Sequence, residues 1–353
     1  MPLRLPPVFR VFPALALAVA VCCAWEARAA TVTDALGATV TVPDAPKRVY
    51  ALSPPDALLV YAINPCLLVG WNMPQPPAAK AWYPACVRDL PVLGGFFGQG
   101  MTPNKEALLA AAPDLVISGT MARSNRDFDA FFTGLGIPVV HIDSGTVADY
   151  PKALRLLGRL LGDPARGEAQ GAYAQDTLEA IAKGVAGIPE DKRLRVYYAE
   201  GEDGLATDGR GSFHTQVLEM AGGINVHATP QTQRYGMDKV TMETVIGYAP
   251  QLILAQTPKV QAAIQASPTW RVIPAVRDGR VVGLPSLPIN WFDRPPSFMR
   301  LLALKWMAHT LYPDAFPYDM ARETQAFCKL FWDKDLTEAQ ARALLESGAA
   351  ARP

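Results

Sequence analysis

Histidine and cysteine are scarce in this sequence, and neither is spaced for a metal site. The four histidines, His141, His214, His227 and His309, share no ligand spacing, and no Cys-x-x-Cys pair occurs. The G-x-S-x-G, H-E-x-x-H and G-x-x-x-x-G-K motifs of hydrolases, zinc proteases and phosphate-binding loops are also absent. These absences argue against a structural zinc and the commonest exported enzymes, and we expect no cofactor and no directly bound metal ion.

An excess of either charge is missing as well. Lys and Arg number 33, Asp and Glu number 33, and the formal net charge is +0. A chain without a basic patch or an acidic tail is not expected to bind nucleic acid. Half of the 353 residues are hydrophobic, which is enough to build the core of two domains or of one large one.

The first 29 residues have the pattern of a cleavable signal peptide. Arg4 and Arg10 precede the apolar run "VFPALALAVAVCCAW", and the small-residue sequence "ARA" ends at Ala29. The run is too short and too close to the start for a comfortable membrane span. We therefore expect export to the periplasm, with a retained membrane anchor as the alternative. A lipoprotein at Cys22 or Cys23 is disfavoured because the preceding residues are too bulky.

Three cysteines follow the predicted leader. Cys66 and Cys86 lie in one short region, so closing the loop between them costs little entropy, and a disulfide is plausible in an oxidising compartment. Three is an odd number, so the remaining thiol, Cys328, is expected to be buried and inert.

Two stretches of the chain repeat one pattern. "NKEALLAAAPDLVI" begins at Asn104 and "TMETVIGYAPQLIL" begins at Thr241, and each starts with a good helix N-cap. Glu106 and Glu243 each lie seven residues before a proline that leads into a buried strand. A favourable interaction with the helix dipole, at about 0.3–1 kcal/mol, would explain one acidic residue but not the identical spacing in both copies.

The rest of the chain alternates strands and helices around a helical stretch. We expect a hairpin in "TVTDALGATVTVP", strands in "KRVYALSP", "CLLVGW", "PDLVISG" and "IPVVHID", and a long surface loop over 72–97. Helices broken at Asp163-Pro164 follow, the alternation restarts at "KRLRVYYAEG", and the last sixty residues are helical.

Further matches between the two halves keep their order along the chain. "RVYALS" pairs with "RVYYAE", "LLVGW" with "INVHA", and "GIPVVHID" with "DGRVVGLP". This order predicts an α/β protein of two related lobes with a ligand cleft between them. The expected boundaries are a signal peptide at 1–29, a first lobe at 30–148, linker helices at 149–188 and a second lobe at 189–353.

These residues resemble the helical-backbone substrate-binding proteins of ABC importers for ferric siderophores, haem and cobalamin, which have relatives for molybdate-type oxyanions. The resemblance covers the mature chain and is carried by the opening hairpin, "GGFFGQGMTPNKEALLAAAPDLVI", "AGGIN" and "NWFDRPPS". It implies a monomer with two Rossmann-like lobes that are joined by a single long rigid helix and close slightly on the ligand. It also implies that Glu106 and Glu243 pair with arginines on the two halves of a permease dimer.

Candidate ligand contacts lie in the loops that follow the predicted strands. Aromatic side chains in a glycine-rich loop offer flat apolar area to a ligand that the backbone can approach closely. Arginines match carboxylate, catecholate or oxyanion groups through their planar fork, and a helix N-terminus favours an anion. The candidates are Trp71, Asn72, Phe96, Phe97, Gln99, Arg210, Ser212, Arg234, Tyr235, Trp291 and Arg294.

Each candidate has a purely structural alternative. The phenylalanines can pack under their own loop, Trp71 can be a core residue, and the segment around Arg210 can be a solvated turn. Arg294 can pair with the neighbouring Asp293. In the family, a small-residue and glutamate pattern often follows the first strand; here the sequence is "SPPDALLVY", so either Asp56 substitutes or the pocket floor differs.

The expected function is to capture a metal chelate and deliver it to an ABC permease, without catalysis. A ferric siderophore or a related iron complex is expected first on the family's base rate. Molybdate or tungstate, haem and cobalamin are alternatives by the same mechanism. An exported α/β enzyme and a ligand sensor that docks on a receptor are alternatives of other classes.

Overall fold

The computed structural model describes residues 29–96, 102–120, 126–230 and 236–349. It begins with the predicted hairpin, in which β1 (Ala29–Thr33) pairs antiparallel with β2 (Thr39–Pro43). Asp34 Oδ1 accepts hydrogen bonds of 2.9 Å from the backbone N–H groups of Leu36 and Ala38 and so closes the turn.

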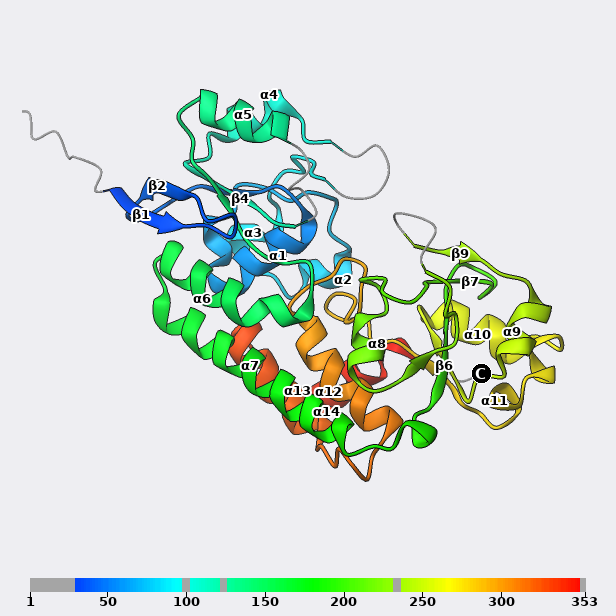
Figure 1. Ribbon diagram of the computed structural model, residues 1–353. Helices are drawn as coiled ribbons and strands as arrows, with labels where there is room; N and C mark the ends of the chain where they lie inside the picture. Colours follow the sequence, from blue (N-terminus) through cyan, green and yellow to red (C-terminus); the bar gives the residue numbers. More distant parts are fainter. Residues whose placement is uncertain (1–28, 97–101, 121–125, 231–235, 350–353) are drawn as a thin grey trace, which may run out of the picture.

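The first lobe is built on a parallel sheet with the order β3-β4-β5. The strands are completely buried because helices cover both faces, and they confirm three of the predicted strands. They are β3 (Val49–Ala51), β4 (Leu115–Ser118) and β5 (Val139–His141). The helices of this lobe are α1 (Pro54–Ile63), α2 (Pro77–Lys80), α3 (Ala85–Arg88), α4 (Lys105–Ala111) and α5 (Arg126–Gly134) (Figure 1).

The strand predicted in "CLLVGW" is not formed, and this prediction was wrong. Pro65 starts a 3₁₀ turn, η1 (Pro65–Leu67), and only a single bridge connects Leu68 with Val49 of β3. A proline has no N–H to donate and favours the start of a turn, so the segment reaches the sheet for only one residue.

The segment expected to be a long surface loop is more ordered than its composition predicts. It contains α2 and α3, and Tyr83 and Val87 are fully buried. A disulfide joins Cys66 to Cys86 with a Cα–Cα distance of 5.3 Å. Cys328 is free and buried.

The second lobe repeats the arrangement of the first. Its parallel sheet has the order β8-β6-β10-β11. In the first lobe the Leu68 bridge, β3, β4 and β5 occupy the same places in the same order. The strands are β6 (Arg195–Ala199), β8 (Ile224–Asn225), β10 (Leu252–Ala255) and β11 (Val281–Gly283), and β7 (Ala206–Thr207) and β9 (Asp238–Lys239) form a separate antiparallel pair. The internal repeat inferred from the sequence is therefore a repeat of topology.

Helices surround the second sheet and form the C-terminal part of the chain. They are α8 (Gln216–Met220), α9 (Met242–Tyr248), α10 (Pro258–Ala266), α11 (Pro274–Arg277), α12 (Met299–Leu311), α13 (Met320–Trp332) and α14 (Glu338–Leu345). The remaining 3₁₀ turns are η2 (Val147–Asp149), η3 (Glu190–Lys192), η4 (Trp270–Val272) and η5 (Glu346–Gly348).

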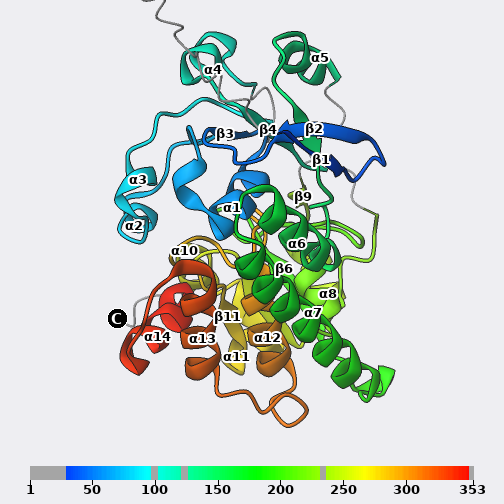
Figure 2. The ribbon, with the colours of Figure 1, turned by 90° about the vertical axis from the view of Figure 1, so that its left-hand side faces the viewer.

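Two helices connect the lobes. α6 (Tyr150–Leu160) and α7 (Pro164–Ala186) break at the predicted Asp163-Pro164, where Asp163 accepts a hydrogen bond from the Arg166 N–H and caps α7. The two helices lie side by side because glycines permit close contact: a Cβ on Gly158 would lie 2.6 Å from the Gly167 Cα. The 23-residue α7 runs along one side of the molecule and leads to the second lobe (Figures 1 and 2).

The C-terminal helices return to the first lobe. Trp332 of α13 packs against Tyr61 of α1 at a ring-centroid distance of 5.1 Å, and Phe298 stacks on the same tyrosine at 6.4 Å. Arg166 of α7 forms an ion pair of 2.9 Å with Asp333, directly after α13. The aromatic contacts bury large apolar area and hold the two lobes together on the side of α7.

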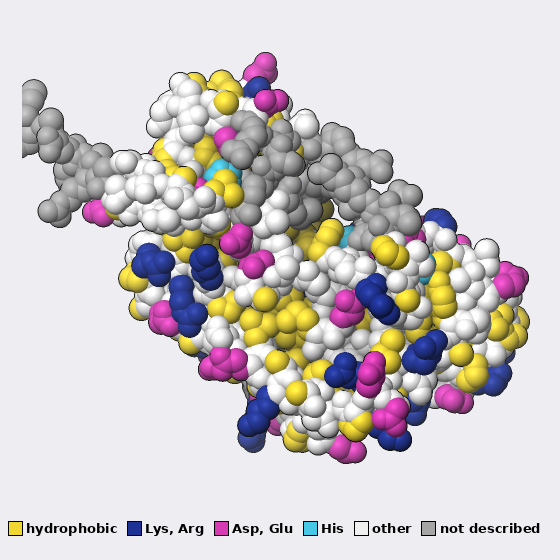
Figure 3. Space-filling view, viewed as in Figure 1, with side chains coloured by type: hydrophobic (Ala, Val, Ile, Leu, Met, Phe, Trp, Pro, Cys, Tyr) yellow, Lys and Arg dark blue, Asp and Glu magenta, His cyan; other side chains and the backbone are white. Residues whose placement is uncertain are grey.

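The surface of the lobes carries mixed charge. Figure 3 shows acidic and basic side chains interspersed over the visible face, in keeping with the balanced composition. Among the described residues, no helix is both long and apolar enough to cross a membrane.

Candidate ligand-binding site

A pocket of about 170 Å³ lies where the two lobes face each other. One side comes from the start of α1 and the segment after it, and the other from the loop that follows β11. Amide and hydroxyl groups of Asn72, Gln75, Ser286 and Asn290 interrupt a mainly apolar lining. The lining residues are Pro54, Leu58, Trp71, Asn72, Met73, Pro74, Gln75, Pro76, Ala78, Ser286, Leu287, Pro288, Ile289, Asn290, Arg294 and Pro295.

Trp71 and Asn72 border this pocket and are also structural. The Trp71 indole donates from Nε1 to the Val87 carbonyl oxygen at 2.8 Å and stacks on Tyr83. Asn72 Nδ2 donates to the Ala51 carbonyl oxygen at 2.8 Å. Asn72 Oδ1 is buried and accepts no hydrogen bond from the described residues.

The glycine-rich loop before α4 is described only in part. Phe96 packs edge-to-face on Phe128 with a centroid distance of 4.9 Å and belongs to the core of the first lobe, as its structural alternative predicted. It does not border the pocket. Phe97 and Gln99 lie outside the described residues, as do Arg234 and Tyr235 of the second lobe.

Three second-lobe candidates lie away from the pocket lining. Arg210 is exposed. Ser212 is buried and donates from Oγ to Asp208 at 3.3 Å, so it braces a carboxylate. Trp291 is fully buried and donates from Nε1 to the Leu287 carbonyl oxygen at 2.6 Å, where it supports the loop that borders the pocket.

Arg294 does border the pocket, and buried carboxylates surround its guanidinium. Nη2 lies 2.9 Å from Glu200 Oε1 and 3.2 Å from Asp208 Oδ2, and Nε lies 3.4 Å from Asp293 Oδ2. The Arg294 side chain is 30% exposed, whereas those of the three acids are fully buried. The Asp293 pairing considered from the sequence is thus present, but two further acids join it.

Burial and mutual repulsion change the ionisation of this cluster. Burial, the hydrogen bond with Asp208 and the charge of Asp293 raise the pKa of Glu200 well above its ordinary value. Burial opposes the charge of Arg294, but the carboxylates of Asp293 and Glu200 outweigh it and raise the pKa of Arg294. Glu200 is therefore harder to ionise than an ordinary glutamate, and Arg294 stays charged.

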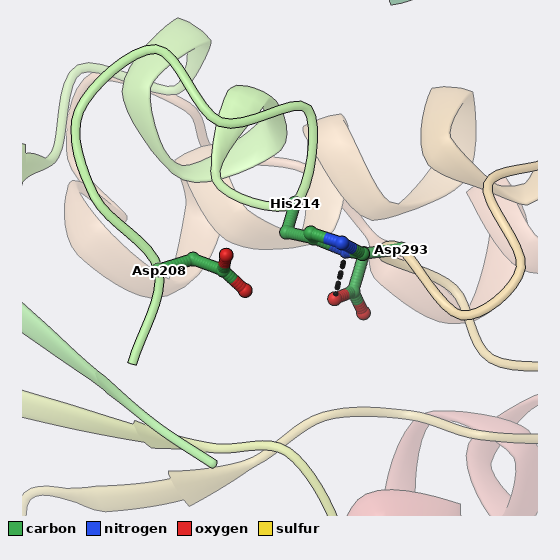
Figure 4. A group of neighbouring side chains, drawn as sticks. All are labelled: Asp208, His214 and Asp293. Atoms are coloured by element: carbon green, nitrogen blue, oxygen red, sulfur yellow. Dashed lines mark hydrogen bonds and ion pairs between the residues drawn. The ribbon is translucent and has the colours of Figure 1, made fainter. Parts of the chain in front are cut away.

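Three members of this region could supply ligand atoms to a metal ion. Asp208, His214 and Asp293 bring two carboxylate oxygens and an imidazole nitrogen within 4.8 Å of one another (Figure 4). His214 Nδ1 lies 2.9 Å from Asp293 Oδ2. These are suitable donors for a divalent transition metal. The Arg294 guanidinium already contacts both carboxylates, however, and in this arrangement it takes the neutralising role of a cation.

Sequence reasoning missed Glu200, Asp208 and His214 as parts of one cluster. Arg294 and Glu200 are 94 positions apart, and their meeting depends on the packing of two loops at the same edge of the sheet. The only local signal is "TDGRGSFH", in which Asp208 and His214 flank the predicted contacts Arg210 and Ser212.

Asp56 occupies the corresponding edge of the first lobe. Its carboxylate is buried and accepts hydrogen bonds from Ser53 Oγ, the Gly119 N–H and Ser144 Oγ at 2.5, 2.9 and 2.9 Å. These hydrogen bonds join α1 to the loops that follow β4 and β5.

Glu106 and Glu243 are exposed in the first turns of α4 and α9. Asn104 and Thr241 cap these helices by accepting a hydrogen bond from the backbone N–H three residues later, at 3.0 and 3.3 Å. Hydrogen bonds from its own backbone N–H and from Thr241 lower the pKa of Glu243, so this carboxylate stays ionised.

The two helices end alike as well. Each is seven residues long, and each is followed by an alanine in the left-handed conformation, Ala112 with φ 41° and Ala249 with φ 43°. A left-handed conformation is uncommon for a residue other than glycine, so its presence at both ends indicates that both lobes fix this helix in the same geometry.

Comparison with known proteins agrees with this architecture. The family described as periplasmic binding protein matches residues 95–288. A vitamin B12-binding protein of Salmonella typhi is 30% identical over 270 residues, which cover 75% of this chain and 90% of that protein.

Solved structures show the same fold. An ABC transporter solute binding protein from Sulfurospirillum deleyianum DSM 6946 superposes with a TM-score of 0.84 at 34% identity, covering 90% of this chain and 99% of that one. The molybdate-bound MolA of Haemophilus influenzae superposes with a TM-score of 0.69 at 22% identity, covering 87% and 99% of the two chains, a likeness in fold alone. With two repeated α/β lobes and a pocket between them, the chain belongs to the periplasmic binding protein family.

Proposed function

We propose that this protein captures a metal chelate in the periplasm and delivers it to an ABC permease, and that the chelate is of the corrinoid type. The observation that carries the proposal is the composition of the pocket. Its lining is apolar with neutral amide and hydroxyl groups, and the only charged lining group among the described residues, Arg294, is compensated by buried acids. Capture and release of a ligand involve no covalent step, so the proposed function requires no catalytic residue.

This composition favours a ligand with apolar faces and amide groups at its edge over a small, highly charged anion. A corrinoid has amide side chains around a flat metal-containing ring. In the pocket these can meet the Asn290 amide at Nδ2, since Asn290 Oδ1 accepts three backbone N–H groups. They can also meet the half-buried Gln75 in exchange for its hydrogen bonds with Met73 and Tyr83. A pocket of about 170 Å³ is smaller than the usual range for ligand sites, so a large chelate would place one edge in it and extend outward between the lobes.

The similarity to a vitamin B12-binding protein at 30% identity supports the same ligand class. A ferric siderophore is the second candidate. It is favoured by the exposed Arg210, which lies outside the pocket lining and could meet an anionic group of a ligand that extends out of the pocket.

Isothermal titration calorimetry of the chain from Ala30 onward tests this proposal. The panel is cyanocobalamin, a ferric catecholate, a ferric hydroxamate, haemin, molybdate and free divalent metal ions. We expect saturable binding of cyanocobalamin, with a loss of affinity in Gln75→Ala and in Asn290→Asp, which keeps the Oδ1 that accepts the backbone N–H groups of residues 292–294. Tight binding of molybdate alone would overturn the assignment to metal chelates.

The exposed glutamates of α4 and α9 provide the proposed docking surface for the permease. The pair is duplicated in the two lobes, which suits a partner made of two equivalent subunits. Figure 1 shows α4 and α9 at the outer ends of their lobes, both away from α7, so a single partner that contacts both would span the side of the cleft opposite the connecting helices.

A further inference from the structure

Large hydrophobic side chains are rarely exposed in this protein, and two of the exceptions occupy equivalent places. Leu109 in α4 is 51% exposed and Ile246 in α9 is 46% exposed. Each follows the glutamate of its helix by three residues. Among the described residues the strongly exposed large hydrophobics are Leu36, Val92, Leu109, Leu135, Ile246 and Val272.

The position of these two residues places them beside the glutamates. Side chains at i and i+3 of a helix share a face, so Glu106 and Leu109 form one surface patch and Glu243 and Ile246 form another. Both helices also bury the residue two positions after the glutamate, Leu108 in α4 and Val245 in α9. The buried residue fixes the rotation of each helix, and the acidic–apolar pair therefore faces outward in both.

We infer that Leu109 and Ile246 are apolar anchors that enter two equivalent hydrophobic recesses in the subunits of the permease dimer, each next to a basic residue that meets the glutamate. The inference rests on the proposed function and adds a second, uncharged component to the docking surface. Single exposed hydrophobics are ordinary on protein surfaces. Here an exposed hydrophobic occupies the same helical position in both lobes, three residues after the exposed glutamate.

The two components have different physical consequences. Charge attraction between glutamate and arginine speeds association and weakens in salt, whereas apolar burial mainly slows dissociation. A docking site with only glutamates would lose most of its affinity in concentrated salt. A docking site that also contains the apolar anchors should keep part of its affinity in concentrated salt.

The test measures binding of the mature chain to the permease–ATPase complex of the same organism, held in nanodiscs, by biolayer interferometry at low and high salt. We expect Leu109→Ser with Ile246→Ser to weaken binding by at least about tenfold at both salt concentrations, mainly through faster dissociation. The control pair is Leu135→Ser with Val272→Ser, which removes side chains of similar exposure, 49% and 51%, and is expected to bind like wild type. Thermal melting checks that every variant is folded.

The outcomes separate this inference from the proposed function. Failure of the wild-type chain to bind the permease overturns both. If wild type binds and Glu106→Ala with Glu243→Ala weakens binding while Leu109→Ser with Ile246→Ser does not, the apolar anchors alone are overturned. A wild-type dimer in gel filtration that only the serine pair dissociates, with permease binding unchanged, would show that a second copy of this chain covers these residues instead.

Discussion

Arg48 and Arg195 hold equivalent positions in the two lobes. Each donates from Nη2, at 2.5 Å, to the last carbonyl oxygen of the helix that carries the exposed glutamate, Ala111 in α4 and Tyr248 in α9. The arginines are 147 residues apart and the glutamates 137. The contact is therefore kept although the intervening loops differ in length, which indicates that the placement of these helices matters to both lobes.

Removing either arginine should loosen only its own helix. A cation at a helix C-terminus satisfies free carbonyl groups and interacts favourably with the dipole. We expect Arg48→Met to speed amide hydrogen exchange in α4 but not in α9, and Arg195→Met to do the reverse. Each substitution should lower the free energy of local opening of its own helix by about 1 kcal/mol. Equal changes in both helices would contradict the pairing of each arginine with one helix.

Arg294→Ala should destabilise the fold as well as alter the pocket. The substitution leaves Glu200, Asp208 and Asp293 buried without their cation, which we expect to lower the free energy of unfolding by about 3 kcal/mol at neutral pH. Urea unfolding measures the change. Arg210→Ala is the matched control because Arg210 is exposed, and its effect should stay within about 0.5 kcal/mol. Equal stability of the two variants would show that the acids do not depend on Arg294.

The raised pKa of Glu200 makes stability depend on pH in the direction opposite to that of an ordinary paired carboxylate. Above the ordinary pKa of 4.5, the unfolded chain releases a proton that the folded protein retains. The contribution of Glu200 to stability therefore falls as the pH rises from that value towards the raised pKa. Glu200→Gln cannot ionise, so its unfolding free energy relative to wild type should increase over this range. Parallel pH profiles of the two proteins would refute the retained proton.

Loss of the disulfide should destabilise the first lobe. Cys66 and Cys86 are 20 residues apart, and opening a loop of this length costs about 3 kcal/mol in the chain-entropy description. Cys66→Ser with Cys86→Ser should lower the free energy of unfolding by that amount, and reductant should do the same to wild type. Burial raises the pKa of the Cys328 thiol to about 12, so this residue is not expected to exchange with the disulfide. If the double serine variant has the same free energy of unfolding as wild type, the disulfide does not contribute to stability.

Local patterns predicted the elements whose signals lie within a few residues. The hairpin follows from alternation around a turn, and α4 and α9 follow from an N-cap and a spaced proline. "CLLVGW" misled because its apolar run suggests a strand, whereas Pro65 starts a turn that leaves one residue at the sheet edge.

The carboxylate cluster could not be predicted because its members meet only in the folded protein. Glu200 follows β6, Asp208 follows β7 and Asp293 lies in the loop after β11. Nothing near Arg294 in the sequence indicates that two further acids contact it. From the sequence, Arg294 was therefore predicted to contact an anionic ligand. Only the tertiary packing brings Glu200 and Asp208 to its guanidinium, where they balance its charge.

The most direct test of the account measures uptake of radiolabelled cyanocobalamin into proteoliposomes that contain the permease and its ATPase. Wild type and Glu106→Ala with Glu243→Ala should bind the ligand with equal affinity by calorimetry. Only wild type should support uptake, and Glu190→Ala with Glu346→Ala, which removes two other exposed glutamates, should behave like wild type. Equal uptake by all three proteins would contradict docking through α4 and α9.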